Sequence, residues 1–276
     1  MGADVTLCGG GAVRLSRRQI ELHDEQRDLG EEGARALAAL LAQVFRGTVL
    51  DAGGGSGRVS VMLRALGASP LLLDLSADML TAAPRSVPRV RADLTALPLA
   101  DASVDGVHAA YAIQNVPQWR TAVRELVRVV RPGGALLVAW GSGRPDPLVL
   151  RVREHYMAEV APWAGVAAER TGLRSVEEAD DALREAGCPL VGTPTVQGSQ
   201  TRTVRQLVER TAGNPSQSRP PEPARRTAID TTLRWAGDWC DVDAPQHVLV
   251  AHEYRLYRLN PQDLPGTKVT KLIVSR

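Results

Sequence analysis

This sequence of 276 residues has few cysteines, no long apolar run and almost no excess charge. Because no run approaches the ~18 apolar residues of a membrane span and no signal-peptide layout is present, we expect a cytoplasmic protein without a membrane partner. The three cysteines, Cys8, Cys188 and Cys240, lie far apart and form no CxxC pair. That spacing argues against a metal site or a disulfide framework and fits a reducing cytoplasm.

Lysine is rarer still. Only two of the 33 basic residues are lysine, Lys268 and Lys271, and both lie close to the C-terminus. Against 31 acidic residues the formal net charge is +2, which is too small to predict binding to nucleic acid. Residues 264–276, which hold both lysines, are either a divergent natural tail or residues carried over from an expression vector. In both cases we expect them to lie outside the core and the pocket.

Strand-like and helix-like segments alternate over the first 140 residues. Apolar strands are expected at 48–51, 70–74, 104–111 and 135–140, with a weaker one at 89–92. Helices are expected at 31–45, from the glycine-rich loop through Leu66, at 77–83 and at 118–130. This repeated alternation requires crossover connections, so it predicts an α/β fold with a mostly parallel sheet.

The second half of the chain is less regular. Helices are expected at 175–186 and 204–210, and strands at about 189–197 and 247–258. Two stretches, 141–173 and 211–245, are interpreted as irregular. Within the second, NPSQSRPPEP (214–223) indicates a mobile loop, because its prolines are incompatible with a helix interior or a central strand.

The stretch VLDAGGGSGRVS, residues 49–60, places a glycine-rich loop directly after a strand. It is not a phosphate-binding P-loop, because Arg58 and Val59 stand where that motif requires lysine and serine or threonine. A dinucleotide fingerprint requires a third glycine at the position of Arg58, which disfavours NAD and FAD. What remains is an acid, Asp51, followed by glycine at alternate positions.

This pattern resembles the first motif of class I S-adenosylmethionine-dependent methyltransferases, an acid followed by GxGxG. Further segments resemble the family in the same order: DLSADML from Asp74, RADLTALPLADASVDGV at 91–107, AAYAIQNV at 109–116 and LVRVVRPGGALLVAW at 126–140. The segment at 109–116 is similar to the ubiquinone/menaquinone-biosynthesis and type 11 subgroup. The resemblance covers about residues 30–140 and implies a seven-stranded, Rossmann-like doubly wound enzyme of the small-molecule type.

By this resemblance the cofactor is S-adenosyl-L-methionine. Glycines let the backbone approach the methionine part, while Asp74 accepts hydrogen bonds from the ribose and Asp93 from the adenine amino group. The alternatives are that Asp74 merely precedes a helix cap at Ser76 and that Asp93 closes a turn through Thr95. The expected cofactor residues are Asp51, Gly53, Gly55, Ser56, Gly57, Asp74, Leu75, Met79, Asp93, Leu94 and Ala110.

The sequence assigns no catalytic residue. If the acceptor must lose a proton, the candidate general bases are His155 and His23, and neither is favoured by a motif. The strand histidines His108, His247 and His252 are expected to be structural. Residues expected to face the substrate are Tyr111, Gln114, Asn115, Tyr156, Trp163 and Trp235, although ordinary packing explains the tryptophans equally well.

We therefore expect one domain over residues 1–276, with a substrate cap formed by 1–29, 141–173 and 198–245. The expected reaction is methylation of a small molecule, and the arginine-rich composition favours a tailoring step in secondary metabolism. A non-methylating enzyme of the cyclase type is one alternative. An RNA methyltransferase is another, disfavoured because the sequence shows no concentration of basic residues beside the glycine loop. The arginines at 120, 124 and 128 are expected to form a solvated helix face. Neither the acceptor nor the oligomeric state is predicted, and no metal is expected.

Overall fold

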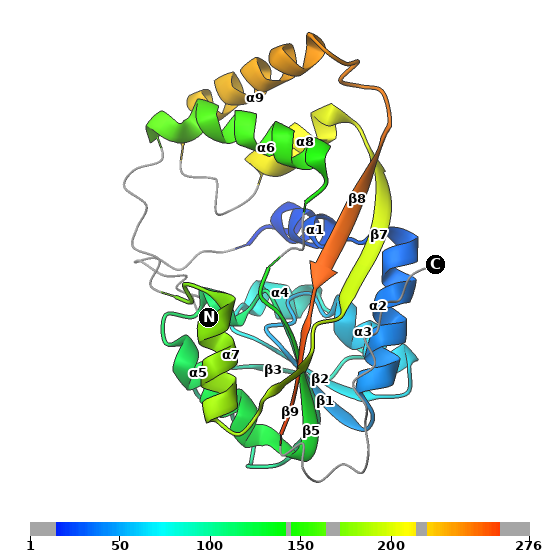
Figure 1. Cartoon of the computed structure of the whole chain (residues 1–276), viewed down its shortest axis with the longest axis vertical. Coiled ribbons are helices and arrows are strands. Elements are labelled where there is room, and N and C mark those ends of the chain that lie inside the picture. The colour runs from blue at the N-terminus through cyan, green and yellow to red at the C-terminus, as the bar shows by residue number, and fades with distance from the viewer. Residues whose placement is uncertain (1–14, 142–144, 164–171, 214–219, 260–276) are drawn as a thin grey trace.

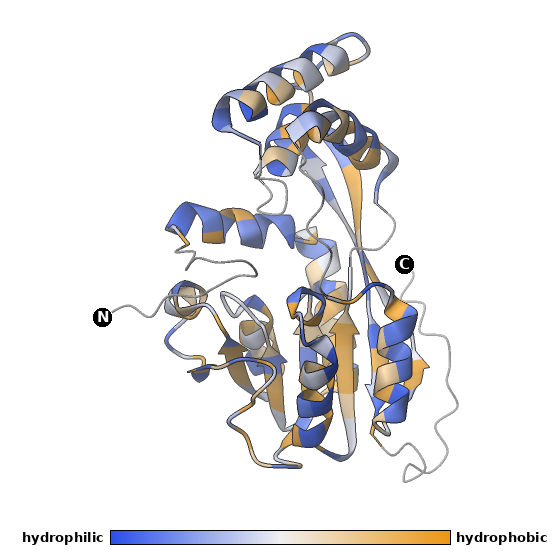
Figure 2. Ribbon diagram, turned by 90° about the vertical axis from the view of Figure 1, so that its left-hand side faces the viewer, coloured by the Kyte–Doolittle hydropathy of each residue, from blue (hydrophilic) through white to orange (hydrophobic). Residues whose placement is uncertain are grey.

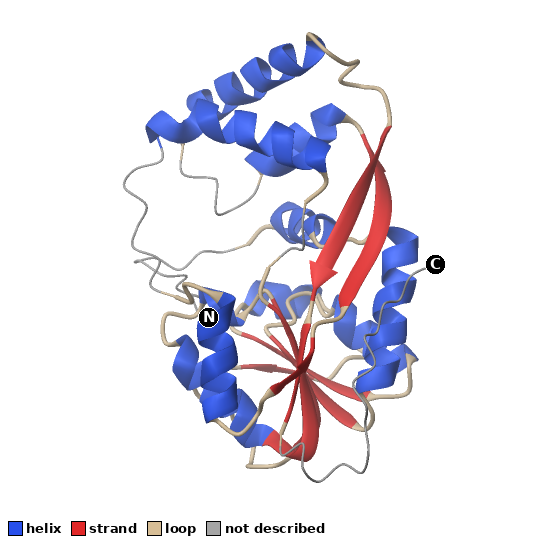
Figure 3. Cartoon of the chain, viewed as in Figure 1, coloured by secondary structure: helices blue, strands red, loops and turns tan. Residues whose placement is uncertain are grey.

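The computed structural model describes residues 15–141, 145–163, 172–213 and 220–259 (Figure 1). A sheet flanked by helices forms one end of the molecule, and a helical lobe forms the other. A two-stranded antiparallel ribbon runs from the sheet to the lobe (Figures 1 and 3). In Figure 2 the strands of the sheet are mostly hydrophobic and the outer faces of the helices mostly hydrophilic, so the core lies on the two faces of the sheet.

The seven-stranded sheet has the order β3-β2-β1-β4-β5-β9-β6. Its strands are β1 (Thr48–Ala52), β2 (Ser69–Asp74), β3 (Arg89–Arg91), β4 (Val104–Ala110), β5 (Val130–Ala139), β6 (Leu190–Gly192) and β9 (Arg255–Arg258). The first five strands pair in parallel, while β9 pairs antiparallel with both β5 and β6. The expected mostly parallel, Rossmann-like doubly wound fold is therefore confirmed.

Among the described residues, five helices pack against the sheet, and two of them begin at a serine cap. The five are α2 (Gly30–Val44), α3 (Arg58–Ala65), α4 (Ala77–Ala82), α5 (Trp119–Val129) and α7 (Val176–Glu185). The Ser76 hydroxyl accepts from the backbone N–H of Met79 at the start of α4, and Ser175 caps α7 in the same way. A 3-10 turn, η1 (Ile113–Asn115), follows β4 and leads to α5.

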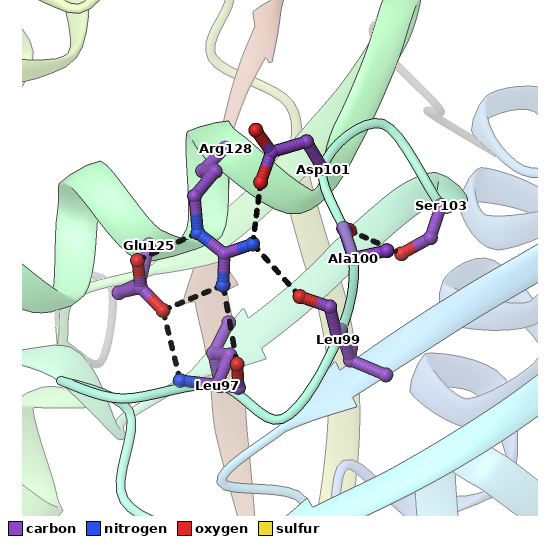
Figure 4. Close-up of polar contacts among 7 residues, drawn as sticks. All are labelled: Leu97, Leu99, Ala100, Asp101, Ser103, Glu125 and Arg128. Carbon is purple, nitrogen blue, oxygen red and sulfur yellow. Dashed lines mark hydrogen bonds and ion pairs between the residues drawn. The ribbon is translucent and has the colours of Figure 1, made fainter.

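One arginine of α5 differs from the expected solvated face. Arg120 and Arg124 are exposed, but Arg128 is about 30% exposed and holds the loop after β3 (Figure 4). Its guanidinium donates two hydrogen bonds of 2.7 Å to Glu125, one of 2.7 Å to Asp101 and others to the carbonyl oxygens of Leu97 and Leu99. This helix face therefore positions a loop.

In the part of the chain that the structure describes, the lobe contains one α-helix that the sequence predicted, at 204–210, and two that it did not. Helices α6 (Pro147–Val160), α8 (Val204–Ala212) and α9 (Glu222–Gly237) pack on one another through a separate apolar cluster, and the 3-10 turn η2 (Ala161–Trp163) follows α6. The prediction of irregular structure over 141–173 and 211–245 was therefore wrong for α6 and α9. Pro147 and Pro223 lie in first turns, where the missing N–H would have no helical partner anyway.

Two expected strands are each divided. The strand expected at 189–197 becomes β6 and the ribbon strand β7 (Thr195–Arg202), and the strand expected at 247–258 becomes β8 (Gln246–Glu253) and β9. Tyr254 separates β8 from β9, and its N–H donates to the carbonyl oxygen of Pro194. The ribbon, β7 paired with β8, therefore continues directly into the sheet.

The N-terminal helix α1 (Arg17–Gln26) lies between the sheet and the lobe (Figure 1). It begins with a capping box in which Ser16 and Gln19 satisfy each other's backbone N–H groups. The tail 264–276 and most of the loop 214–223 lie outside the described residues, so the expectations for both stay predictions. Among the described residues no helix is long and apolar enough to cross a bilayer.

Candidate functional site

The glycine-rich loop follows β1 and requires glycine for two reasons. Gly53, Gly55 and Gly57 have φ angles of 66°, 59° and 79°, a region that residues with a Cβ rarely adopt. Gly53 also passes so close to the end of β4 that a Cβ on it would lie 2.4 Å from Cβ of Ala112. The loop thus crosses from β1 to the start of α3 at the carboxyl edge of the sheet, the edge at which open α/β sheets bind ligands.

Asp74, the last residue of β2, fixes the loop from the neighbouring strand. Its Oδ2 atom accepts from the N–H of Gly55 at 2.9 Å and its Oδ1 atom from the N–H of Ser76 at 2.8 Å. Burial raises the pKa of Asp74 above the ordinary value. Each oxygen keeps a further lone pair, so the carboxylate remains able to accept hydrogen bonds from a diol.

The carboxylate of Asp51 forms hydrogen bonds with buried side chains of the protein itself. It is 1% exposed, its Oδ2 atom accepts from the Ser60 hydroxyl at 2.6 Å, and its Oδ1 atom lies 2.9 Å from Nδ1 of His108. A Cβ on Gly54 would lie 2.6 Å from the Asp51 carboxylate. Asp51 therefore supports the loop from its buried side, and its contact with a cofactor stays a prediction.

Around the loop the other expected cofactor residues lie at strand and helix ends. Asp93 is exposed and accepts through Oδ1 from the N–H and the hydroxyl of Thr95, both at 2.8 Å, so the turn considered as its alternative role is present. Leu94 and Met79 are buried, whereas Leu75 is 39% exposed. The sulfur of Met79 lies 3.8 Å from the position of a Cβ on Gly55, which puts it beside the loop.

Helix α1 covers the loop from the other side. The Ser56 hydroxyl donates to Oδ2 of Asp24 at 2.7 Å, and Arg58 donates to the Asp24 carbonyl oxygen. Burial raises the pKa of Asp24, but hydrogen bonds from His23 and Ser56 outweigh it, so this pKa is below its ordinary value. The ring of His23 lies 3.6 Å from the position of a Cβ on Gly55. Helix α1 therefore reaches the glycine loop, while a substrate cap formed by residues 1–29 stays a prediction, and residues 1–14 lie outside the described part of the chain.

A cavity of about 770 Å³ lies between α1, α3 and α4. Ser56, Arg58 and Asp78 line it, but Gly53, Asp74 and Tyr111 do not. It is therefore beside the glycine loop and not between the loop and the lobe. Within the described ranges, no group of three or more histidine, cysteine or acidic residues forms a metal site.

An aromatic residue, Tyr111, lies at the site directly after β4. Tyr111 directly follows Ala110, the last residue of the strand, and has a φ of 58°, a strained value for a residue with a large side chain. Its ring meets His252 of the ribbon edge-on, with centroids 5.2 Å apart, and Arg27 lies over it at 5.4 Å. Asn115 donates to the Tyr111 carbonyl oxygen.

The crowded, positively charged surroundings of His252 lower its pKa. Burial first, and then the positive charges of Arg27 and Arg210, lower its pKa to about 4. The imidazole is therefore neutral at physiological pH and a poor base. Arg27, Arg210 and Asp24 were not predicted as site residues, because they come from the α1 region and from α8, far apart in the sequence, and no local motif contains them.

The remaining candidates lie in the lobe. His155 stacks on Trp235 with ring centroids 4.1 Å apart, Tyr156 is buried in the lobe core, and Trp163 is 45% exposed at the end of η2. His155, Trp235 and Tyr156 therefore lie together in the lobe and not beside the glycine loop. Gln114, by contrast, is half-buried in η1 beside β4.

Comparisons with known proteins agree with this geometry. Residues 50–138 match the methyltransferase domain family, type 11. The demethylmenaquinone methyltransferase of Clavibacter sepedonicus is 37% identical over 133 residues, which cover 46% of this chain and 54% of that protein. The demethylmenaquinone methyltransferase of Mycolicibacterium vanbaalenii is 37% identical over 148 residues, which cover 52% of this chain and 65% of that protein. The chain thus spans only about half to two thirds of these relatives.

Similar solved structures extend over more of the chain. A protein from Anaeromyxobacter dehalogenans assigned as a type II methyltransferase is 24% identical, with a TM-score of 0.58 over 82% of this chain and 95% of its own. At that identity the likeness demonstrates the fold alone.

Proposed function

Because residues 50–138 belong to the methyltransferase domain family, we propose that the protein transfers a methyl group from S-adenosyl-L-methionine to a small-molecule acceptor. The observation that carries the proposal is the clamp of Asp74 on the glycine loop. A carboxylate at the end of β2 fixes the N–H of Gly55 and still has free lone pairs at the edge where a ligand binds.

The residues at this edge fit the proposed cofactor. When bound, the cofactor supplies an electrophilic methyl group on a sulfonium. Asp74 would accept from its ribose hydroxyls, the positive-φ glycines would give the methionine part close access to the backbone, and Met79 and Leu94 would pack on the adenine. Asp93 would accept from the adenine amino group through the oxygen that Thr95 does not use.

The acceptor would bind between Tyr111, α1 and the lobe. Residues 1–29, 141–173 and 198–245 would form this cap, since α1 reaches the glycine loop and the ribbon carries His252 to Tyr111. The names of the relatives favour a quinone-type acceptor. We place the reaction in the cytoplasm and, given the arginine-rich composition, in a tailoring step of secondary metabolism.

No residue is firmly placed as a general base. Of the two candidates, His23 is better located, because its ring lies beside Gly55 whereas His155 stacks in the lobe. Holding donor and acceptor in contact supplies much of the acceleration in such a displacement. The main contribution of the chain would therefore be to orient the two molecules and to exclude water.

The experiment is to titrate the full chain with S-adenosylhomocysteine and then to incubate it with labelled cofactor and a panel of quinols, naphthols and catechols. Micromolar binding, about −8 kcal/mol, and a labelled product in mass spectrometry are expected. Binding with an altered but unmethylated product would instead establish the cyclase alternative. Absence of binding would refute the proposal. In a parallel incubation with RNA, labelling of the RNA and of none of the small molecules would establish the RNA methyltransferase alternative.

A further inference from the structure

Three half-buried arginines gather where α1, the ribbon and the lobe meet, and one of them contacts Tyr111. Arg27 follows α1, Arg202 ends β7, and Arg210 lies in the last turn of α8. Arg27 lies over the Tyr111 ring, and Arg210 donates a hydrogen bond to the carbonyl oxygen of Gln26. The cluster therefore connects the helix above the glycine loop to the lobe.

Burial makes this concentration of positive charge costly. Desolvation lowers the pKa of Arg27 and of Arg210, and the positive charge of Arg202 lowers that of Arg210 further. Guanidinium groups nevertheless stay protonated in proteins. Collecting them away from water is unfavourable unless a negative charge offsets their mutual repulsion.

The nearby acidic residues are engaged elsewhere. Asp28 lies 3.5 Å from Arg58, Glu25 lies 3.7 Å from Arg18, and Asp24 accepts from the glycine loop. In the part of the chain that the structure describes, no carboxylate oxygen lies within ion-pair distance of the three clustered arginines. Asp24, Asp28 and Glu25 offset part of the positive charge from a longer distance, without forming an ion pair with the cluster. A further anion in direct contact with these arginines would therefore be favourable.

Their hydrogen-bond donors also remain largely unused. An arginine carries five N–H donors. Among the described residues, Arg27 donates one bond, of 3.1 Å, to the His23 carbonyl oxygen, and Arg202 one of 3.2 Å to Gln200. The other donors are suited to a negatively charged oxygen, the partner with which guanidinium forms its strongest hydrogen bonds.

We propose that Arg27 and Arg210 bind the ionised hydroxyl of an aromatic or enolic methyl acceptor beside Tyr111. This inference rests on the proposed function, because it takes the methyl donor to lie at the glycine loop. It adds the charge state of the acceptor: the site selects phenolates and enolates over neutral rings of the same shape.

The transfer then balances without a proton acceptor in the protein. A lone pair of the ionised acceptor forms the new bond to the methyl carbon, and the pair of the broken S–C bond returns to sulfur. The negative charge of the acceptor and the positive charge of the sulfonium both disappear. The hydroxyl proton passes to solvent when the acceptor binds, since nearby cations favour the ionised form. A base at His23 or His155 is therefore unnecessary.

The test uses 4-nitrophenol, whose ionisation is visible in its absorbance, and 4-nitroanisole, which has the same ring and cannot ionise. With S-adenosylhomocysteine present, the wild-type protein is expected to bind the nitrophenolate about tenfold more tightly than neutral nitrophenol. That preference lowers the apparent pKa of the bound probe by about one unit. Arg27→Gln and Arg210→Gln should each reduce the shift by at least half and leave 4-nitroanisole binding unchanged.

Two further variants keep the test interpretable. Arg27→Lys keeps the charge and should retain most of the shift, which separates charge from folding. Arg35→Gln removes an exposed arginine of α2 that pairs with Glu31, and it should change nothing. No shift in the wild type, or the same shift in Arg27→Gln, overturns the inference. Weaker S-adenosylhomocysteine binding with an unchanged probe shift would assign the arginines to the cofactor, which leaves the proposed function intact.

Discussion

His108 of β4 and Asp51 of β1 are joined inside the sheet, with Nδ1 of the imidazole 2.9 Å from Oδ1 of the carboxylate. Both side chains are almost completely buried. Asp74, at the end of the adjacent strand, is only partly buried and bonds to the backbone of the glycine loop. Two acids that look alike in the sequence therefore have separable roles.

Asp51→Ala is expected to destabilise the protein strongly. The substitution leaves the His108 imidazole and the Ser60 hydroxyl buried without their acceptor, at a cost of about 3 kcal/mol in the free energy of unfolding. Urea unfolding followed by circular dichroism measures it. Asp181→Ala, an exposed acid of α7, is the control and should cost about 0.5 kcal/mol or less. Equal losses in both variants would contradict the assignment.

Asp74→Asn is expected to show the opposite pattern. Binding of S-adenosylhomocysteine should weaken by roughly 1.5–3 kcal/mol, because hydrogen bonds to a charged acceptor are lost. The amide keeps only one of the two backbone hydrogen bonds of Asp74, but burial raises the pKa of Asp74, so the neutral amide also avoids the cost of an ionised group there, and the melting temperature should fall only slightly. Calorimetry and a thermal scan test both parts. Unchanged affinity with a strongly lowered melting temperature would remove Asp74 from the cofactor site.

His252 gives the protein a specific acid sensitivity. Its pKa is lowered from 6.5 to about 4, so between these values the unfolded chain binds a proton that the folded chain does not. Stability is then expected to fall as pH decreases through this window, by up to about 1.4 kcal/mol per pH unit. His252→Gln should flatten that dependence in urea titrations between pH 7 and pH 5. His247→Gln, an exposed position on the same strand, should leave it as steep as in the wild type.

Substitutions at two glycines compare the cost of a steric clash with the cost of backbone strain. A Cβ on Gly198 of β7 would lie 2.1 Å from the carbonyl oxygen of Leu29 and 2.7 Å from the nitrogen of Gly33. Gly198→Ala must therefore push the ribbon away from α2, at a cost of about 3 kcal/mol or more. Gly67 has a φ of 85° but open space around it, so Gly67→Ala should cost only about 1–2 kcal/mol. Denaturant midpoints rank the two, and a reversed order would contradict the packing.

Arg128→Ala is expected to release the loop that carries Asp93. The change removes the bonds to Glu125, Asp101 and two carbonyl oxygens, at a cost of about 2 kcal/mol. Arg124→Ala, on the same helix and exposed, should cost well under 1 kcal/mol. Arg128 lowers the pKa of Glu125, so this stabilisation is present above about pH 4.5 and is lost as the pH falls through the lowered value. Unfolding at neutral and acidic pH measures both effects.

The sheet was predictable because its strands carry a continuous signal. Buried parallel strands produce apolar runs such as PLLLD and ALLVAW, and α5 has a wide apolar stripe. Helix α9 carries no such signal. The residues it buries are Ala224, Ala228, Thr232 and Ala236, a stripe of small side chains at every fourth position that hydropathy alone does not mark.

The candidate site also has a part that the sequence predicted and a part that it did not. The glycine loop and Asp74 were found because contiguous motifs contain them. The cluster of Arg27, Arg202 and Arg210 was not, because the fold assembles it from the end of α1, the end of β7 and the last turn of α8. Single arginines in a chain so rich in arginine carry no local pattern, and only their shared burial distinguishes them.

The direct passage of β8 into β9 has a consequence for synthesis on the ribosome. β9 is an interior strand between β5 and β6, yet it emerges after every other described element, and β8 completes the ribbon immediately before it. A nascent chain stopped before Tyr254 would already contain β8, so the ribbon could pair, but without β9 it would expose the edge of β5 and leave β6 without its partner strand. The ribbon can therefore form first, and the sheet closes only when β9, which follows the ribbon directly, inserts between β5 and β6.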